Sequence, residues 1–164
     1  MRKNKRTEHH LRITRFFLAT GLFLLGMATH AATLSVTNSA DSGAGSLRQA
    51  IVDAGSGDTI TFDAALNGSV ITLTSGQLSI NKSLTIQGPG PKLLAINGNG
   101  ASRIAYFSLS VSGSIAVTFT GLMLTNGVAQ SDGGGAIYSC STYTPTGTLT
   151  LSNCVVSPTA LELA

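Results

Sequence analysis

Hydrophobic and polar residues alternate in short runs through most of the chain after residue 31, and the runs end at Gly, Asn or Ser. Alternation with a period of two is typical of β-strands that bury one face, and Gly and Asn are typical of turns. The pattern predicts short strands over 59–62, 70–74 and 78–80.

Three later runs repeat one another. SLTIQG at 83–88, AVTFTG at 116–121 and TLTLSN at 148–153 align without gaps, at offsets of 33 and 32 residues. The alignment stacks Leu84, Val117 and Leu149 in one apolar column, and Ile86, Phe119 and Leu151 in a second. Each block closes with a residue type that accepts a positive φ at a corner: Gly88, Gly121 and Asn153. Further apolar positions follow the three blocks: Leu94 and Ile96, Leu122 and Leu124, and Val155.

One segment has helical spacing instead. Its apolar positions, at i, i+3, i+4 and i+7, are Leu47, Ala50, Ile51 and Ala54. This spacing predicts a short amphipathic helix over 47–54. Ser46 followed by Gln49 has the sequence of a capping box, and Gly55 supplies the stop. So short a helix has to pack against other elements to be stable.

Repeats of about 32 residues indicate a solenoid, in which each coil stacks its apolar residues on those of the next. We therefore predict an all-β fold, a right-handed parallel β-helix of a few coils. The alternative is an antiparallel sandwich, which shares short alternating strands. The helix would close the first coil, so residues 32–58 form an N-terminal cap and residues 59–157 the coils. The residues expected to form the structure of this cap are Ser46, Leu47, Gln49, Ala50 and Ile51.

The N-terminal segment is basic and then apolar. Six of the ten Lys and Arg residues precede residue 16, and residues 16–27 form an apolar run of twelve. That length fits a signal-peptide core and is short of the roughly 20 residues that span a bilayer. Small residues at Thr29 and Ala31 predict cleavage after residue 31, so 1–31 is a signal peptide. An uncleaved anchor is the alternative. We expect no membrane span after cleavage.

The net charge changes sign once residues 1–31 are left out. The whole chain has a net charge of +3, but after residue 31 four basic residues face six acidic ones, and His and Trp are absent. This composition argues against an imidazole-ligated metal, a His-based catalytic triad and a basic nucleic-acid groove. We therefore expect no metal, no cofactor and no nucleic-acid partner.

Both cysteines, Cys140 and Cys154, follow the signal segment. Export implies an oxidising compartment, so the two are a candidate disulfide. Such a bridge closes a loop of about 15 residues, worth about 3 kcal/mol in the chain-entropy model. The alternative is a pair of small buried apolar side chains. A nucleophilic role lacks an activating His in this part of the chain.

Two stretches resemble a known family. VTNSADSGAGSLRQAIVDAGSGDTITFD, followed by ITLTSGQLSINKSLTIQGPG, closely resembles the N-terminal region of secreted bacterial right-handed parallel β-helix proteins. Their cap motif is written CSLREA. Here residues 45–50 match it, with Gly45 in place of Cys and Gln49 in place of Glu. GGGAIYS at 133–139 and TLTLSNCVVS at 148–157 resemble repeats of polymorphic outer-membrane-protein-like and adhesin-like β-helices. The resemblance implies a β-helix and export, and it indicates no particular activity.

Catalytic candidates are sparse. Parallel β-helices include polysaccharide lyases and hydrolases, which need clustered carboxylates. The acids after residue 31 are Asp41, Asp53, Asp58, Asp63, Asp132 and Glu162. Their spacing fits neither a helix face nor a repeated coil position, so we interpret them as turn and surface residues. Asp132, which precedes three glycines, supplies too few ligands for a calcium site, because calcium needs six or more oxygens. Tyr106, Tyr138 and Tyr143 are candidates for stacking on sugars, although a partly buried position at the core edge is the preferred interpretation of Tyr138.

The expected protein is therefore a secreted or cell-surface, outer-membrane-associated β-helix module without enzymatic activity. We expect it to act as a stalk or adhesion surface for surface glycans or host and cell-surface proteins. The last residues, 158–164, predict an irregular or truncated tail, so the chain is interpreted as a fragment of a larger protein. The alternative function is a polysaccharide-acting lyase or hydrolase fragment.

Overall fold

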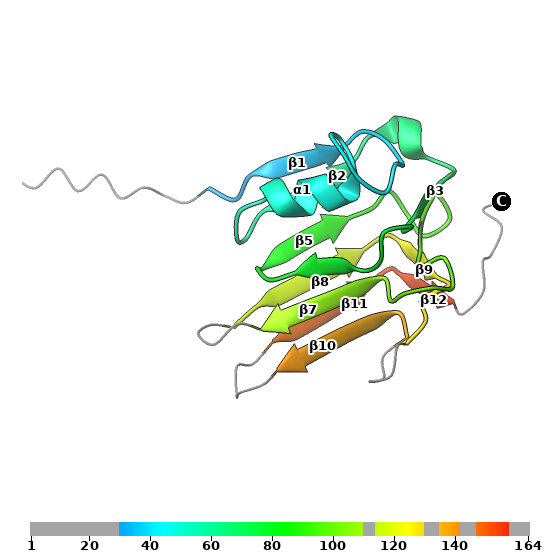
Figure 1. Cartoon of the computed structure of the whole chain (residues 1–164). Helices are drawn as coiled ribbons and strands as arrows, with labels where there is room; N and C mark the ends of the chain where they lie inside the picture. The colour runs from blue at the N-terminus through cyan, green and yellow to red at the C-terminus, as the bar shows by residue number, and fades with distance from the viewer. Residues whose placement is uncertain (1–29, 110–113, 130–134, 142–146, 158–164) are drawn as a thin grey trace, which may run out of the picture. The chain divides into compact units, whose positions relative to one another are not determined.

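The structure is a computed structural model that describes residues 30–109, 114–129, 135–141 and 147–157 (Figure 1). The described residues from Ala31 onward belong to one compact unit. Within them, strands follow one another along the chain with one α-helix and one short 3-10 helix between them. Among the described residues, no helix is long and apolar enough to cross a membrane.

The strands form three sheets. Sheet A contains β1 (Thr33–Val36), β2 (Thr59–Phe62), β5 (Leu84–Gln87), β8 (Ala116–Thr120) and β11 (Thr148–Ser152), in that order. Sheet B contains β3 (Ser69–Thr72), β6 (Leu94–Asn97), β9 (Met123–Thr125) and β12 (Val155–Ser157). Sheet C contains β4 (Leu78–Ile80), β7 (Ala105–Leu109) and β10 (Ile137–Ser141). The helices are α1 (Leu47–Asp53) and η1 (Ala64–Leu66).

Each strand pairs with its equivalent in the next coil, and every described pairing is parallel. Consecutive strands such as β2, β3 and β4 belong to three different sheets, so the chain passes through all three before returning to the first. This arrangement is a parallel β-helix, which confirms the predicted fold class. An antiparallel sandwich is excluded.

The register confirms the aligned repeats. Leu84 pairs with Val117 and Val117 with Leu149, while Ile86, Phe119 and Leu151 are equivalent in the same way. Ile60, Ile86 and Phe119 in this second column are fully buried. The core is thus a set of inward columns along the coils, joined by equivalent columns from sheets B and C.

The structure refines the predicted repeat at two positions. Val155 pairs with Met123, so the position that stacks on Leu124 is Val156. Gly88 is not among the residues with a positive φ, in contrast to Gly121 and Asn153 at the equivalent corner. Gly88 is required because a Cβ there would overlap the Gly121 carbonyl oxygen. The same corner therefore uses Gly88 for space and Gly121 for both space and backbone conformation.

Helix α1 packs on the β1 end of the stack (Figure 1), with Leu47, Ala50 and Ile51 buried. The predicted helix over 47–54 is confirmed, with Ala54 as its C-cap residue. Ser46 is the N-cap, and its Oγ accepts a hydrogen bond from the Gln49 N–H at 3.2 Å.

The capping-box prediction is only half right. The Gln49 side chain donates to Asp53 at 2.8 Å, while the Ser46 N–H donates to the Gly43 carbonyl. The predicted glycine stop is also wrong, since Gly55 lacks a positive φ and its N–H donates to Asp58 at 2.6 Å. Lys82 supplies the contact at this helix end, donating to the carbonyls of Ala54 at 2.6 Å and Val52 at 3.1 Å.

Several predictions concern residues outside the described part of the chain. These residues are 1–29 of the predicted signal peptide 1–31, Asp132, Tyr143, Glu162 and the predicted tail 158–164.

Candidate binding surface

The alternation within each strand points one set of side chains into the core and the other outward. In sheet A the inward set is apolar, as with Ile60 and Ile86, which are fully buried. The outward set therefore consists of the residues between and beside them. Because each coil lies in register on the next, equivalent outward residues form continuous rows across the sheet.

Two rows of uncharged polar side chains, nine hydroxyls and the Gln87 amide, cover the outward face of sheet A. The first row is Thr33, Thr59, Thr85, Thr118 and Thr150, one from each of the five strands. The second is Ser35, Thr61, Gln87, Thr120 and Ser152, in which Thr61 and Gln87 each follow the paired residues Ile60 and Ile86. We call these ten residues the hydroxyl array. Its members are exposed or half-buried, and none is charged.

The hydroxyls of this array are largely uncommitted within the protein. Among its ten residues, a side-chain hydrogen bond is recorded only for Thr61, whose Oγ1 lies 3.4 Å from the Leu34 carbonyl oxygen. The array was not found from the sequence, although a signal was present. TIT in β2, TFT in β8 and TLTLS in β11 all place Thr or Ser on the face opposite the apolar residue.

Sheet C presents aromatic residues on its outward face. Tyr106 lies between the buried Ala105 and Phe107, so it points away from the core, and Tyr138 is its register partner on β10. Their ring centroids are 6.0 Å apart and stacked. Arg103 places its guanidinium 4.5 Å from the centre of the Tyr138 ring, although Arg103 itself is only 4% exposed. Tyr138 therefore belongs to an outward aromatic pair, and it is half-buried, as expected for a position at the core edge.

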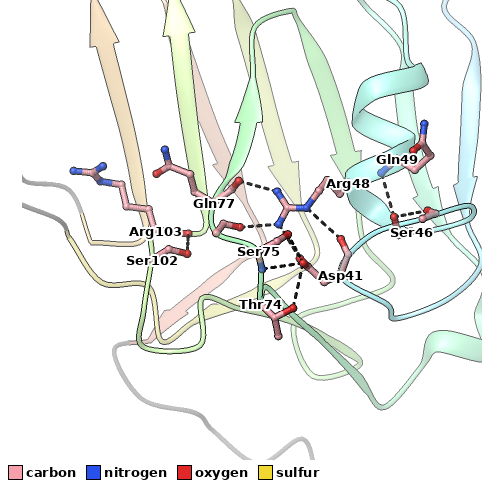
Figure 2. Close-up of polar contacts among 11 residues, drawn as sticks. Asp41, Ser46, Arg48, Gln49, Thr74, Ser75, Gln77, Ser102 and Arg103 are labelled. Atoms are coloured by element: carbon pink, nitrogen blue, oxygen red, sulfur yellow. Dashed lines mark hydrogen bonds and ion pairs between the residues drawn. The ribbon is translucent and has the colours of Figure 1, made fainter.

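The cap contains an ion pair that sequence reasoning missed. Figure 2 shows Arg48 of α1 between Asp41 and the turn after β3. Its guanidinium donates to the Asp41 carboxylate and the Gly76 carbonyl at 2.7 Å each, and to the Gln77 carbonyl at 2.9 Å. The Arg48 and Asp41 side chains are 23% and 10% exposed. We call this group the arginine clamp, and it ties α1 to the coil beneath it.

The other carboxylate oxygen of Asp41 faces the same turn. It accepts hydrogen bonds from the Ser75 N–H at 2.9 Å, the Ser75 hydroxyl and the Thr74 hydroxyl. Burial alone would raise the pKa of Asp41, but the hydrogen bonds from Arg48 and Ser75 outweigh it. The pKa of Asp41 is consequently lowered, and the carboxylate stays ionised as a structural partner.

The other described acids also hold local structure. Asp58 is buried and accepts from the Ala32 N–H at 2.8 Å and from the Gly55 N–H. Asp63 accepts from the Ala65 N–H at 2.8 Å at the start of η1, and Asp53 accepts from Gln49. In the described part of the chain, no group of three or more His, Cys, Asp or Glu side chains is placed to hold a metal ion.

The Cys154 Sγ lies 3.4 Å from the Ser152 carbonyl oxygen, and its side chain packs against the core. Cys140 lies on β10 in sheet C, opposite Ser108, and its side chain is outside the described residues. The disulfide between Cys140 and Cys154 stays a prediction.

The fold and its faces define a parallel β-helix with an N-terminal helical cap and an uncharged, hydroxyl-rich sheet. No protein-family model, curated protein or solved structure matched this chain.

Proposed function

We propose that this chain is an exported β-helix module that acts as an adhesion surface without catalysing a reaction. The resemblance of residues 45–50 to the cap motif of secreted bacterial β-helices supports both the cap and export. The basic and then apolar N-terminal segment supports export through a signal peptide, to the medium or the cell surface.

The hydroxyl array is the observation that favours adhesion most strongly. It presents nine small hydroxyl side chains and the Gln87 amide across five strands in register. A Thr side chain is stiff about χ1, so its hydroxyl loses little conformational freedom when it binds. Since the array has no charged member, its partner is an extended, uncharged and hydroxyl-rich surface, of which surface glycans are one example.

The described acids support a role without catalysis. Asp41 is held by Arg48, and Asp58 by two backbone N–H groups. Asp63 caps the 3-10 helix. Each carboxylate is thus engaged in folding contacts, whereas glycoside chemistry places two carboxylates on either side of one bond.

Adsorption to a panel of extended uncharged materials tests adhesion. The panel contains cellulose, chitin, starch granules and ice. We expect retention on at least one material, loss of retention in Thr118→Lys, and normal retention in Ser79→Lys, which makes the same change on the exposed face of sheet C. Failure to adsorb to any material contradicts the proposal, and release of reducing sugars contradicts the absence of catalysis.

Export is tested separately. The full chain is expressed in a bacterium, the periplasm and medium are collected, and the N-terminus of the exported protein is determined by mass spectrometry. We expect it to begin at Ala32. A chain that stays uncleaved in the cytoplasm contradicts export and leaves the adhesion test unaffected.

A further inference from the structure

We propose that the partner of the hydroxyl array is an ordered water lattice, the surface of an ice crystal. This inference rests on the proposed adhesive function and names its partner. It starts from the registers of sheet A, which align Thr33, Thr59, Thr85, Thr118 and Thr150 in one row without stagger.

The geometry of a parallel sheet fixes the spacing of the array. Neighbouring strands lie about 4.8 Å apart, and residues two positions apart on one strand lie about 6.7 Å apart. The two rows therefore form a nearly rectangular grid of side chains. Its shorter repeat is close to the separation of equivalent oxygen atoms along the a axis of hexagonal ice, and its longer repeat is close to that along the c axis.

The chemistry of the side chains fits such a lattice. A Thr hydroxyl both donates and accepts hydrogen bonds, as a lattice water does, and its methyl group fills the space between two waters. Thr118 and Thr120 on β8 show the arrangement, with both side chains half-buried between neighbouring strands and Phe119 locked in the core between them. Waters held on a stiff grid need little rearrangement to join a crystal.

Charge and aromaticity distinguish water from a polysaccharide as the partner. The array has no charged member, so no ion orients water away from the lattice. It also has no aromatic ring of the kind that stacks on a sugar, since the described outward tyrosines, Tyr106 and Tyr138, lie on sheet C. The face of sheet B opposite its core column has an apolar row, in which Ala95 and Met123 are buried, and a polar row. The apolar row is Val70, Ala95, Met123 and Val155, and the polar row is Thr72, Asn97, Thr125 and Ser157. Sheet A alone among the three described faces has a row with a Thr on every one of its strands.

The test grows polycrystalline ice slowly from a dilute solution of the full chain and measures the fraction of protein that the ice takes up. The same samples are examined for inhibition of ice recrystallisation. We expect Thr118→Lys to lower the uptake at least about tenfold, the equivalent of about 1.4 kcal/mol. Thr118→Ser should have a smaller effect because it keeps the hydroxyl and loses the methyl group. Ser79→Lys on sheet C is the matched control and should bind ice normally.

A second variant is needed because Thr118→Lys lies at the centre of the sheet and could lose binding through misfolding. Thr150→Lys changes an exposed position at the last described strand of the row, and circular dichroism verifies that each variant is folded. Equal uptake by Thr118→Lys and Ser79→Lys overturns the assignment of the array to ice. Adsorption to polysaccharides without uptake into ice overturns the partner and leaves adhesion standing. A chain that adsorbs neither to ice nor to any polysaccharide overturns both the assignment to ice and the adhesive function.

Discussion

Inward apolar side chains are buried at one end of the described stack and exposed at the other. At the β1 end, Val36 and Ile60 are fully buried, because α1 places Leu47 and Ile51 over the first coil. At the β11 end, Leu149 and Leu151 continue the inward columns but are 39% and 43% exposed. An inward residue of a solenoid is therefore buried only to the extent that another layer covers it.

The difference shows what the cap adds to the fold. An uncovered coil leaves apolar columns and strand edges open to solvent, which invites association with other chains. At the β1 end, the first coil is covered by a seven-residue helix, which the arginine clamp and a lysine at the helix terminus help to hold in place. Each of these contributions can be removed by itself.

Truncating one leucine in each environment gives the largest expected difference. Leu84 and Leu149 belong to the same column, but Leu84 is 2% exposed and Leu149 is 39% exposed. Leu84→Ala should lower the free energy of unfolding by about 2–5 kcal/mol because it opens a cavity. Leu149→Ala should cost about 1 kcal/mol, since much of that side chain already contacts water. Urea unfolding followed by circular dichroism measures both. Equal losses would show that the β11 end is covered in solution.

Breaking the arginine clamp is expected to have the next largest effect. Arg48→Ala removes the bonds to Gly76 and Gln77 and leaves Asp41 without its cation, so we expect a loss of about 2 kcal/mol. Arg48→Lys should recover only part of this loss, because an ammonium group cannot reproduce the planar fork. Lys92→Ala, at an exposed cation, is the control and should change stability little. A loss no larger than that of Lys92→Ala would show that the helix is held by its apolar face alone.

Acidification should weaken the capped end through Asp41. Its pKa is lowered in the folded state, so its contribution to stability is fully present above the unfolded pKa of about 3.9 and is lost as the pH falls through the folded value. The difference in unfolding free energy between the wild type and Asp41→Asn should therefore shrink between pH 6 and pH 3. In an Arg48→Ala background this pH dependence should be smaller, because the principal partner is gone. The same pH dependence in both backgrounds would assign it to other groups.

Much of the fold could be predicted because it is local or repeated. The residue ranges predicted for β2 and β4 match the structure, and the aligned repeats gave the register of β5, β8 and β11. Strands without a clear alternating signal were missed. β7 reads AYFSL, and it forms a strand because it pairs with β4 on one side and β10 on the other. Such pairing depends on residues far away in the sequence.

The candidate sites were harder to predict for the same reason. The arginine clamp depends on the Gly76 and Gln77 carbonyls, and every residue has a carbonyl, so no sequence pattern marks these two. The hydroxyl array is visible only after the coils are placed in register. A single Thr in a strand indicates β-structure, whereas five in one row indicate a surface.

The end of α1 offers the smallest test of the capped end. Lys82, from the turn between β4 and β5, donates to the carbonyls of Val52 and Ala54, where a helix has unpaired acceptors and a partial negative charge. Lys82→Met keeps the aliphatic stem and removes the charge, so we expect a loss of about 0.5–1 kcal/mol in the free energy of unfolding. Lys92→Met is the matched control at an exposed position. Equal effects of the two substitutions would mean that water replaces Lys82 at these carbonyls without cost, and that the apolar face and the clamp alone distinguish the capped end from the open one.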